Sequence, residues 1–284
     1  MSPPPPSPGP SRWPPPYKAA LSFTMDNLGE AQDVLNGKWP HPIGTHPAVT
    51  SQLPRMLALL DKYQIKATYF AESWSLAVYP DTIRALQDAG HEVAWHGYQH
   101  EVWKNLSPEA EQENFDKSWE AARKAGVTYE GFRPPGGSIN DGTWGLLREH
   151  GVGYVSPLGE LGVGKEGVVV LPFEWRGVDA FWYMDKFRGI RKDHGEREEI
   201  ENPEKELKGW LLGKIREIKQ TGGYLSVLFH PFLQTSEGRF AVLEEVLGEI
   251  AAEEDIWVAT CREVAGWVRE HPDLFEAGAG GAIV

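Results

Sequence analysis

Short apolar runs alternate with amphipathic segments along most of this chain. The runs at 17–25, 67–70, 92–95 and 224–230 have the length and composition of buried strands, and apolar residues at helical spacing lie between them. Strand and helix alternate about seven or eight times, a pattern that is typical of a parallel sheet. The 284-residue length suits one domain built as a (β/α) barrel.

The two ends of the chain differ from this pattern. Residues 1–16 combine prolines with small polar residues, which predicts an extended or disordered arm before a barrel at 17–275 and a flexible tail at 276–284. The arm is too rich in proline for a secretory signal, and no apolar run reaches the ~20 residues of a spanning helix. We therefore expect a protein that is cytoplasmic or secreted without a leader.

Charge and cysteine content narrow the range of partners. The net charge of −13 disfavours nucleic acid and anionic membrane surfaces, and favours a neutral or cationic substrate. Cys261 is the single cysteine, so an internal disulfide is excluded. The sequence leaves open whether the chain forms a homo-oligomer.

Polar residues with catalytic chemistry fall at the predicted strand ends. They are Asp26, His96, His100, Arg133, Asp179 and His230. Chemistry in barrels of this kind sits where strands end and loops begin, so we expect these side chains to face one pocket. His96 and His100 have a spacing that allows two imidazoles to bind one cation if their loop curls back. Asp26, at the end of a buried strand, needs a partner or a metal.

Each of these residues also has a structural interpretation. His230 could be a core histidine, Arg133 could pair with a surface carboxylate, and Asp179 could cap a turn. His91 is expected to be structural and not a ligand. The 12 tryptophans must also build the core, so aromatic content alone does not indicate sugar binding.

Four segments in order carry a resemblance to a known family. The sequences at 67–70, 90–100, 132–137 and 228–231 resemble the motifs of polysaccharide deacetylases, the NodB homology group or carbohydrate esterase family 4. The resemblance covers roughly residues 18–270. Within the family, the chain looks similar to the branch of peptidoglycan-deacetylase-like proteins and cyclic-amide hydrolases, and to fungal chitin-oligosaccharide deacetylases.

The resemblance implies a distorted (β/α)7 barrel with one divalent metal. The metal is usually Zn²⁺, with Co²⁺ as an alternative, and its ligands would be Asp26, His96 and His100. Two neutral imidazoles and one carboxylate suit Zn²⁺ and leave positions open for water and a substrate carbonyl.

The resemblance also implies catalytic and binding roles. His230 would protonate the departing amine, while Arg133 and Asp179 would orient the acid and the base. Contacts with an N-acetylated oligosaccharide substrate are expected from Tyr98, Pro135, Gly136 and Trp182.

The first motif departs from the family pattern. The family usually has Thr-Phe-Asp-Asp, with the first aspartate as base and the second as metal ligand, where this chain has Thr24-Met25-Asp26-Asn27. One alignment makes Asp26 the catalytic base and puts Asn27 at the metal. The other puts Thr24 at the base position and Asp26 on the metal, and we favour it because losing the anionic ligand costs metal affinity. Glu30 or Glu72 could then replace the base.

The sequence predicts a hydrolase acting on carbon–nitrogen bonds, specifically one that removes acetyl groups from N-acetylglucosamine oligomers. The alternatives are hydrolysis of a small cyclic amide or imide, and a catalytically impaired sugar-binding homologue. His230 argues against the last, because binding alone has no need of a proton donor.

Overall fold

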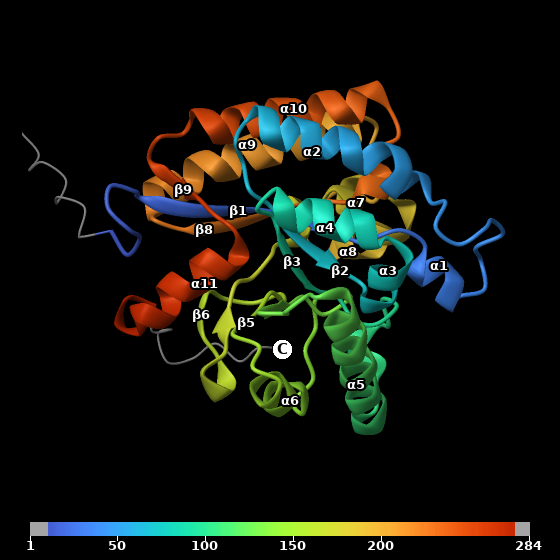
Figure 1. The fold of residues 1–284 in the computed structure, drawn as a ribbon. Helices are drawn as coiled ribbons and strands as arrows, with labels where there is room; N and C mark the ends of the chain where they lie inside the picture. The colour runs from blue at the N-terminus through green and yellow to red at the C-terminus, as the bar shows by residue number, and fades with distance from the viewer. Residues whose placement is uncertain (1–10, 276–284) are drawn as a thin grey trace, which may run out of the picture.

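The computed structural model describes residues 11–275, which are built around one nine-stranded sheet (Figure 1). The strands are β1 (Ala19–Asp26), β2 (Thr68–Ala71), β3 (Glu92–Trp95), β4 (Gly131–Phe132), β5 (Tyr154–Val155), β6 (Gly162–Val163), β7 (Val169–Val170), β8 (Tyr224–Phe229) and β9 (Ile256–Val258). Their order is β6-β7-β5-β4-β3-β2-β1-β8, and β9 also pairs with β1. This arrangement confirms an α/β fold in a single domain.

Strand β1 is the axis of the sheet. On one edge it pairs with β8 from Ala20 to Met25, and on the other it pairs with β9 at its start and β2 at its end. All strand pairs are parallel except β6 with β7. Beyond β8 the only further pairing in residues 11–275 is a bridge between Val178 and Leu228, so the barrel is distorted and stays open there.

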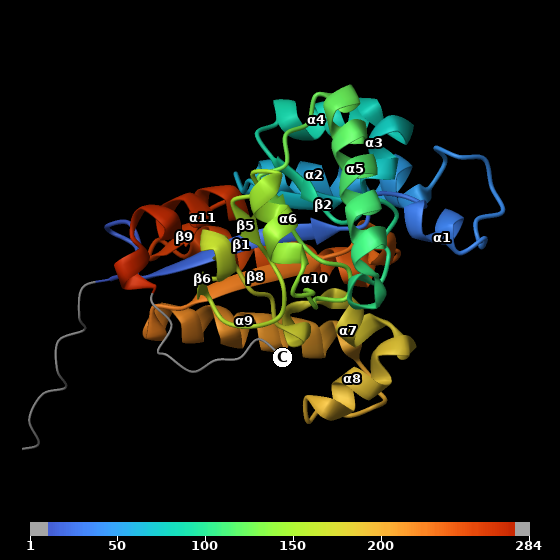
Figure 2. The same ribbon diagram turned by 90° about the horizontal axis from the view of Figure 1, so that it is seen from below.

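Helices cover the sheet on both sides. They are α1 (Ala31–Leu35), α2 (Leu53–Lys62), α3 (Ser73–Val78), α4 (Pro80–Asp88), α5 (Pro108–Ala125), α6 (Thr143–Glu149), α7 (Asp179–Tyr183), α8 (Arg188–Asp193), α9 (Pro203–Thr221), α10 (Glu237–Ala252) and α11 (Cys261–Glu270). In Figure 1, α2, α9 and α10 lie together above the sheet. Figure 2 shows β1 running toward the side where α1, α7 and α8 lie, so these helices border the carboxyl ends of the strands.

Local sequence signals account for several helix ends. Ser107 caps α5 by accepting a hydrogen bond from the Ala110 amide, and Gly126 ends the helix in the left-handed conformation. Thr260 and Glu263 form a capping box at the start of α11. All eight residues of β1 are buried, as expected for a strand covered on both faces.

The predicted disordered arm was wrong for its last residues. Trp13 is buried against Tyr224, Trp257 and Phe275, and its indole nitrogen donates to the Gly222 carbonyl. The indole ring supplies enough apolar area to hold this short segment to the domain. The rest of the predicted arm, 1–10, and the predicted tail lie outside the described residues.

The charge-rich segment 188–203 contains α8. Arg191 is 2% exposed, and its guanidinium donates to the carbonyls of Phe181, Met184 and Glu198. Arg191 therefore joins the C-terminal end of α7 to the loop that follows α8 through charge-assisted hydrogen bonds. The apolar helix α10 was not predicted.

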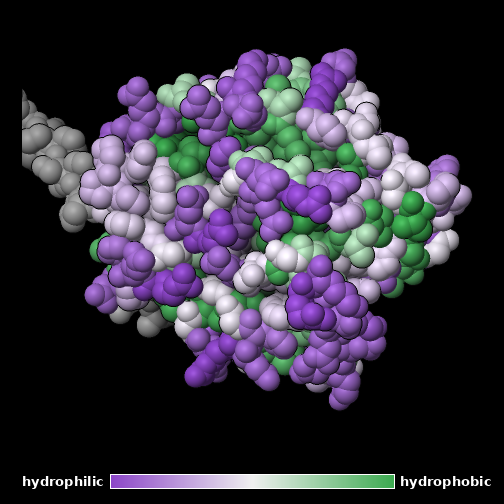
Figure 3. All heavy atoms as spheres, in the orientation of Figure 1, coloured by the Kyte–Doolittle hydropathy of each residue, from purple (hydrophilic) through white to green (hydrophobic). Residues whose placement is uncertain are grey.

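Figure 3 shows hydrophilic side chains gathered over α5 and over the helices above the sheet. Within residues 11–275, no helix combines the length and apolar character needed to cross a membrane.

His91 lies just before β3 and plays the predicted structural role. Its side chain is 6% exposed, and Nδ1 accepts a hydrogen bond from the Ala67 amide at 3.0 Å. Burial lowers the pKa of His91 to about 4, with a smaller contribution from Lys66. The neutral ring is thus the form that the fold accommodates.

This pKa predicts a loss of stability in acid. Between the unfolded value of 6.5 and about 4, the unfolded chain binds a proton that the folded chain does not, so the free energy of unfolding falls as pH falls. His91→Asn keeps an acceptor for Ala67 and removes the titration. Measured by urea unfolding in chelator, the variant should lose about 2 kcal/mol less than wild type between pH 7 and 4.5. Equal losses would contradict the role assigned to His91.

Candidate metal centre and active site

The loop after β3 brings His96 and His100 together. Gly97 has φ +78°, a conformation that glycine adopts without a steric penalty, and His100 has φ +68°. These two left-handed residues turn the loop back, and the imidazole centroids lie 4.8 Å apart. The loop thus curls back and brings the two rings close together, and the metal site on them stays a prediction.

Both imidazoles are held by hydrogen bonds. His96 Nδ1 donates to the Arg133 carbonyl at 2.7 Å, so Nε2 keeps its lone pair. A hydrogen bond of 2.7 Å joins the Gln32 side-chain amide to Nδ1 of His100. Burial lowers the pKa of His96 to about 3 and holds the pKa of His100 well below its usual value. Both rings are therefore neutral at pH 7, as metal ligands must be.

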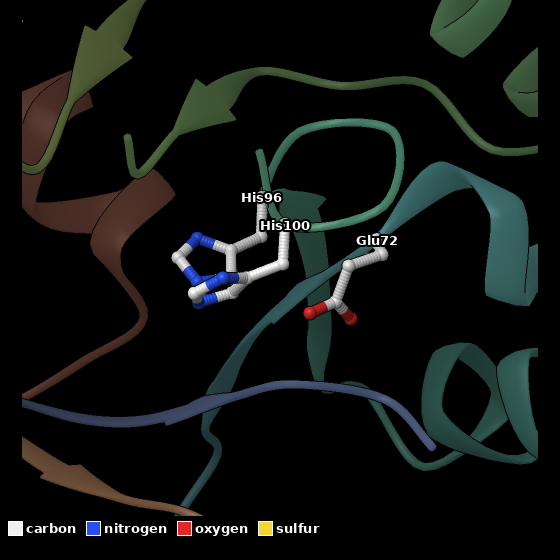
Figure 4. Close-up of side chains that lie close together, drawn as sticks. All are labelled: Glu72, His96 and His100. Carbon is white, nitrogen blue, oxygen red and sulfur yellow. The ribbon is translucent and has the colours of Figure 1, made fainter. Parts of the chain in front are cut away.

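Glu72 joins this pair of histidines. One ligand atom from each of Glu72, His96 and His100 lies within 4.8 Å of the others, and Figure 4 shows the carboxylate beside the two rings. Glu72 is 1% exposed, and burial raises its pKa to about 7. Its oxygens accept hydrogen bonds from Asn27 Nδ2 and the Leu28 amide, both at 2.7 Å.

Asp26 lies next to His96 but is tied to Arg133. Asp26 Oδ2 is 3.6 Å from His96 Nε2, while Asp26 Oδ1 accepts from Arg133 Nη1 at 2.8 Å. Arg133 is 1% exposed and also donates to the hydroxyls of Thr24, Ser156 and Ser226. Arg133 therefore pairs with a buried carboxylate and not with a surface one.

His230 and Asp179 form a second hydrogen-bonded pair. His230 Nδ1 donates to Asp179 Oδ1 at 2.6 Å, and the His230 amide donates to Oδ2 at 2.8 Å. Gln234 Nε2 also donates to Oδ2, and Asp179 is fully buried. The carboxylate thus fixes the tautomer and orientation of the ring and leaves His230 Nε2 free for chemistry.

A cavity of about 330 Å³ collects most of these groups. Asp26, His96, His100, Arg133 and His230 line it, and Pro135 and Gly136 do as well. The remaining wall is mainly apolar and includes Val102, Pro134, Phe173, Trp175, Val178, Ala180, Met184, Phe187, Ile190, Leu228 and Phe232. Asp179 stands behind His230.

Two predicted substrate contacts lie elsewhere. Tyr98 lines a separate hollow between α3 and α5, because its loop turns the side chain away from the two histidines. Trp182 is 5% exposed, does not line the cavity, and donates from its indole nitrogen to the Arg176 carbonyl. Trp95 and Trp103 are fully buried core residues. The aromatic side chains that line the cavity are instead Phe173, Trp175, Phe187 and Phe232.

Two candidates for the general base are occupied by other contacts. Thr24 is buried, and its hydroxyl donates to the Val227 carbonyl while accepting from Arg133. Glu30 accepts hydrogen bonds from the Tyr79 hydroxyl and the Gly44 amide and does not line the cavity.

Comparison with known proteins finds a family similarity over part of the chain. The model of the polysaccharide deacetylase family matches residues 43–155, a range that includes Glu72, His96, His100 and Arg133. The peptidoglycan deacetylase of Helicobacter pylori is 33% identical over 103 residues, which are 36% of this chain and 35% of that protein. The match thus spans about a third of the curated relative.

Solved structures resemble nearly the whole domain. The putative polysaccharide deacetylase from Mycobacterium smegmatis has a TM-score of 0.77 and 29% identity, and the match covers 91% of this chain and 93% of that one. An allantoinase, PuuE, has a TM-score of 0.75 over 94% of this chain and 96% of that one, but its 19% identity supports only a shared fold. Residues 43–155 thus match the polysaccharide deacetylase family, and the fold of the described residues is similar to that of a putative polysaccharide deacetylase.

The buried pair of Arg133 and Asp26 generates a stability prediction. In Arg133→Met, Asp26 loses its cation in a buried site, so we expect the free energy of unfolding to fall by about 3 to 5 kcal/mol in the presence of chelator. Arg84→Met is the control, since the Arg84–Asp81 pair is exposed and should contribute less than about 1 kcal/mol. Similar losses in the two variants, measured by urea unfolding, would show that Arg133 does not hold the strand ends together.

Proposed function

We propose that this protein is a metal-dependent deacetylase that removes acetyl groups from N-acetylglucosamine oligomers. The observation that carries the proposal is that His230, fixed by Asp179, lines the same cavity as Asp26, His96 and His100. A proton donor and a set of metal ligands on one cavity meet the needs of amide hydrolysis.

The donor set suits a divalent cation. Neutral imidazoles and carboxylates are ligands for Zn²⁺ and also for Co²⁺, and Asp26 keeps Oδ2 unbound to Arg133. When bound, such a cation polarises the amide carbonyl and acidifies a water molecule. The His96 ring is held by the Arg133 carbonyl, so the ligand geometry is set before substrate arrives.

His230 supplies the proton that the amine needs to leave. Asp179 accepts from Nδ1, so protonated His230 can donate only from Nε2, into the cavity. Asp179 also stabilises the imidazolium before it donates, without contacting substrate itself.

The cavity wall favours a sugar ring. Trp175 and Phe187 can pack on the apolar face of a pyranose, and Pro135 and Gly136 also line the cavity. A neutral N-acetylated oligosaccharide also avoids the repulsion that a net charge of −13 imposes on acidic polymers.

Hydrolysis of a cyclic amide is the second candidate. Its support is the compact, largely apolar wall of the cavity, which suits a small ring, together with the fold shared with an allantoinase.

The role of His230 gives a test of catalysis against binding. His230→Ala should keep its metal and lose about 10²- to 10⁴-fold in turnover, because the proton donor is removed while the ligands stay. Metal content and initial rates measure the two effects. His41→Ala, at an exposed loop position, is the control and should keep both. Loss of metal in His230→Ala would mean that the residue is a ligand.

A second test concerns the substrate. A chitin tetramer should release acetate and leave free amines faster than a hydantoin or succinimide ring opens at equal concentration. We expect the difference in rate because aromatic side chains pack against a pyranose ring more extensively than against a small heterocyclic ring. Faster ring opening would replace the sugar assignment with the cyclic-amide one.

A further inference from the structure

We propose that Glu72 is itself a ligand of the metal, so that two carboxylates and two imidazoles form the centre. The proposal rests on the metal centre of the proposed function and adds a ligand from β2. It also gives Asn27 a defined role, as the residue that orients Glu72.

The register of the sheet places Glu72 beside His96. Ala71 of β2 is the partner of Trp95 of β3, and the His96 amide donates to the Ala71 carbonyl at 3.0 Å. Glu72 and His96 therefore follow the ends of two neighbouring parallel strands at the same level. Side chains at matched positions of parallel strands point to the same face. The carboxylate is thus brought to the imidazoles by the backbone pairing itself.

Charge gives a second, independent reason. Asp26 has the Arg133 guanidinium as its counter-ion, whereas Glu72 has no Lys, Arg or His ion-pair partner within residues 11–275. Its contacts are neutral donors, the Asn27 amide and the Leu28 backbone. A carboxylate that is 1% exposed is costly without a cation, and a divalent metal between Glu72 and the two imidazoles would supply one.

The hydrogen bonds of Glu72 leave room for a metal. A carboxylate has about four lone-pair positions, and each oxygen of Glu72 accepts one hydrogen bond, so each retains a lone pair. Asn27, with φ +65°, directs its amide nitrogen at Glu72 Oε1. An aspartate at position 27 would set two carboxylates against each other at this distance, so Asn27 and Glu72 are a matched pair.

The test measures metal retention without substrate. Wild type and Glu72→Gln are dialysed, titrated with Co²⁺, and compared for affinity and for the visible absorption of the bound ion. We expect affinity to fall by more than about 100-fold, since the loss of residues that only support ligands already costs 10- to 100-fold. Asn27→Asp should weaken binding less. Glu30→Gln is the matched control, because Glu30 is also a fully buried carboxylate but does not belong to the group formed by Glu72, His96 and His100.

The possible results distinguish a failure of the ligand role of Glu72 from a failure of the metal centre in the proposed function. Unchanged Co²⁺ affinity in Glu72→Gln, with affinity lost in His96→Ala, overturns the ligand role and leaves the metal centre intact. Unchanged affinity in His96→Ala overturns the metal centre itself. If Glu72→Gln does not fold, Glu72→Asp is used, which keeps the charge but draws the oxygens back by one methylene. A Co²⁺ affinity and absorption identical to wild type in Glu72→Asp would then overturn the proposal.

Discussion

The buried guanidinium of Arg133 is the contact on which the site depends. It donates to hydroxyls on β1, on β8 and after β5, and it pairs with Asp26 at the end of β1. The carbonyl of the same residue accepts from the ring of His96. One residue thus fixes both the carboxylate and the imidazole that approach each other at 3.6 Å. Stacking of the guanidinium on Phe70, 4.1 Å from the ring centroid, holds it between the strands.

Residues of the first motif contact both Arg133 and Glu72. Arg133 already neutralises Asp26, so the pair contributes little net charge toward a bound cation. Thr24 accepts a hydrogen bond from the same guanidinium, and Asn27 donates one to Glu72. Thr24 and Asn27, on either side of Asp26, therefore contact two different buried charged groups.

Much of the site could be predicted because parallel strands end on one side of a sheet. Asp26, His96, Arg133 and His230 meet for this reason, with no need to know the strand order. Asp179 follows the same rule, although the strand before it is reduced to the bridge at Val178. The substrate contacts were less predictable, because composition does not say which way a loop turns. Left-handed residues at 97 and 100 send Tyr98 to the outer side of its loop.

The position of the Glu72 side chain could not be predicted from the sequence alone. Its position just before α3 is that of a helix N-cap, and a carboxylate there suggests capping. In the structure its side chain does not cap the helix and accepts from Asn27 and the Leu28 amide instead. The direction of the Glu72 side chain depends on the register of β2 against β3, and packing across both faces of the sheet sets that register. A shift of one residue would send Glu72 to the opposite face from His96 and leave its charge without the imidazoles beside it.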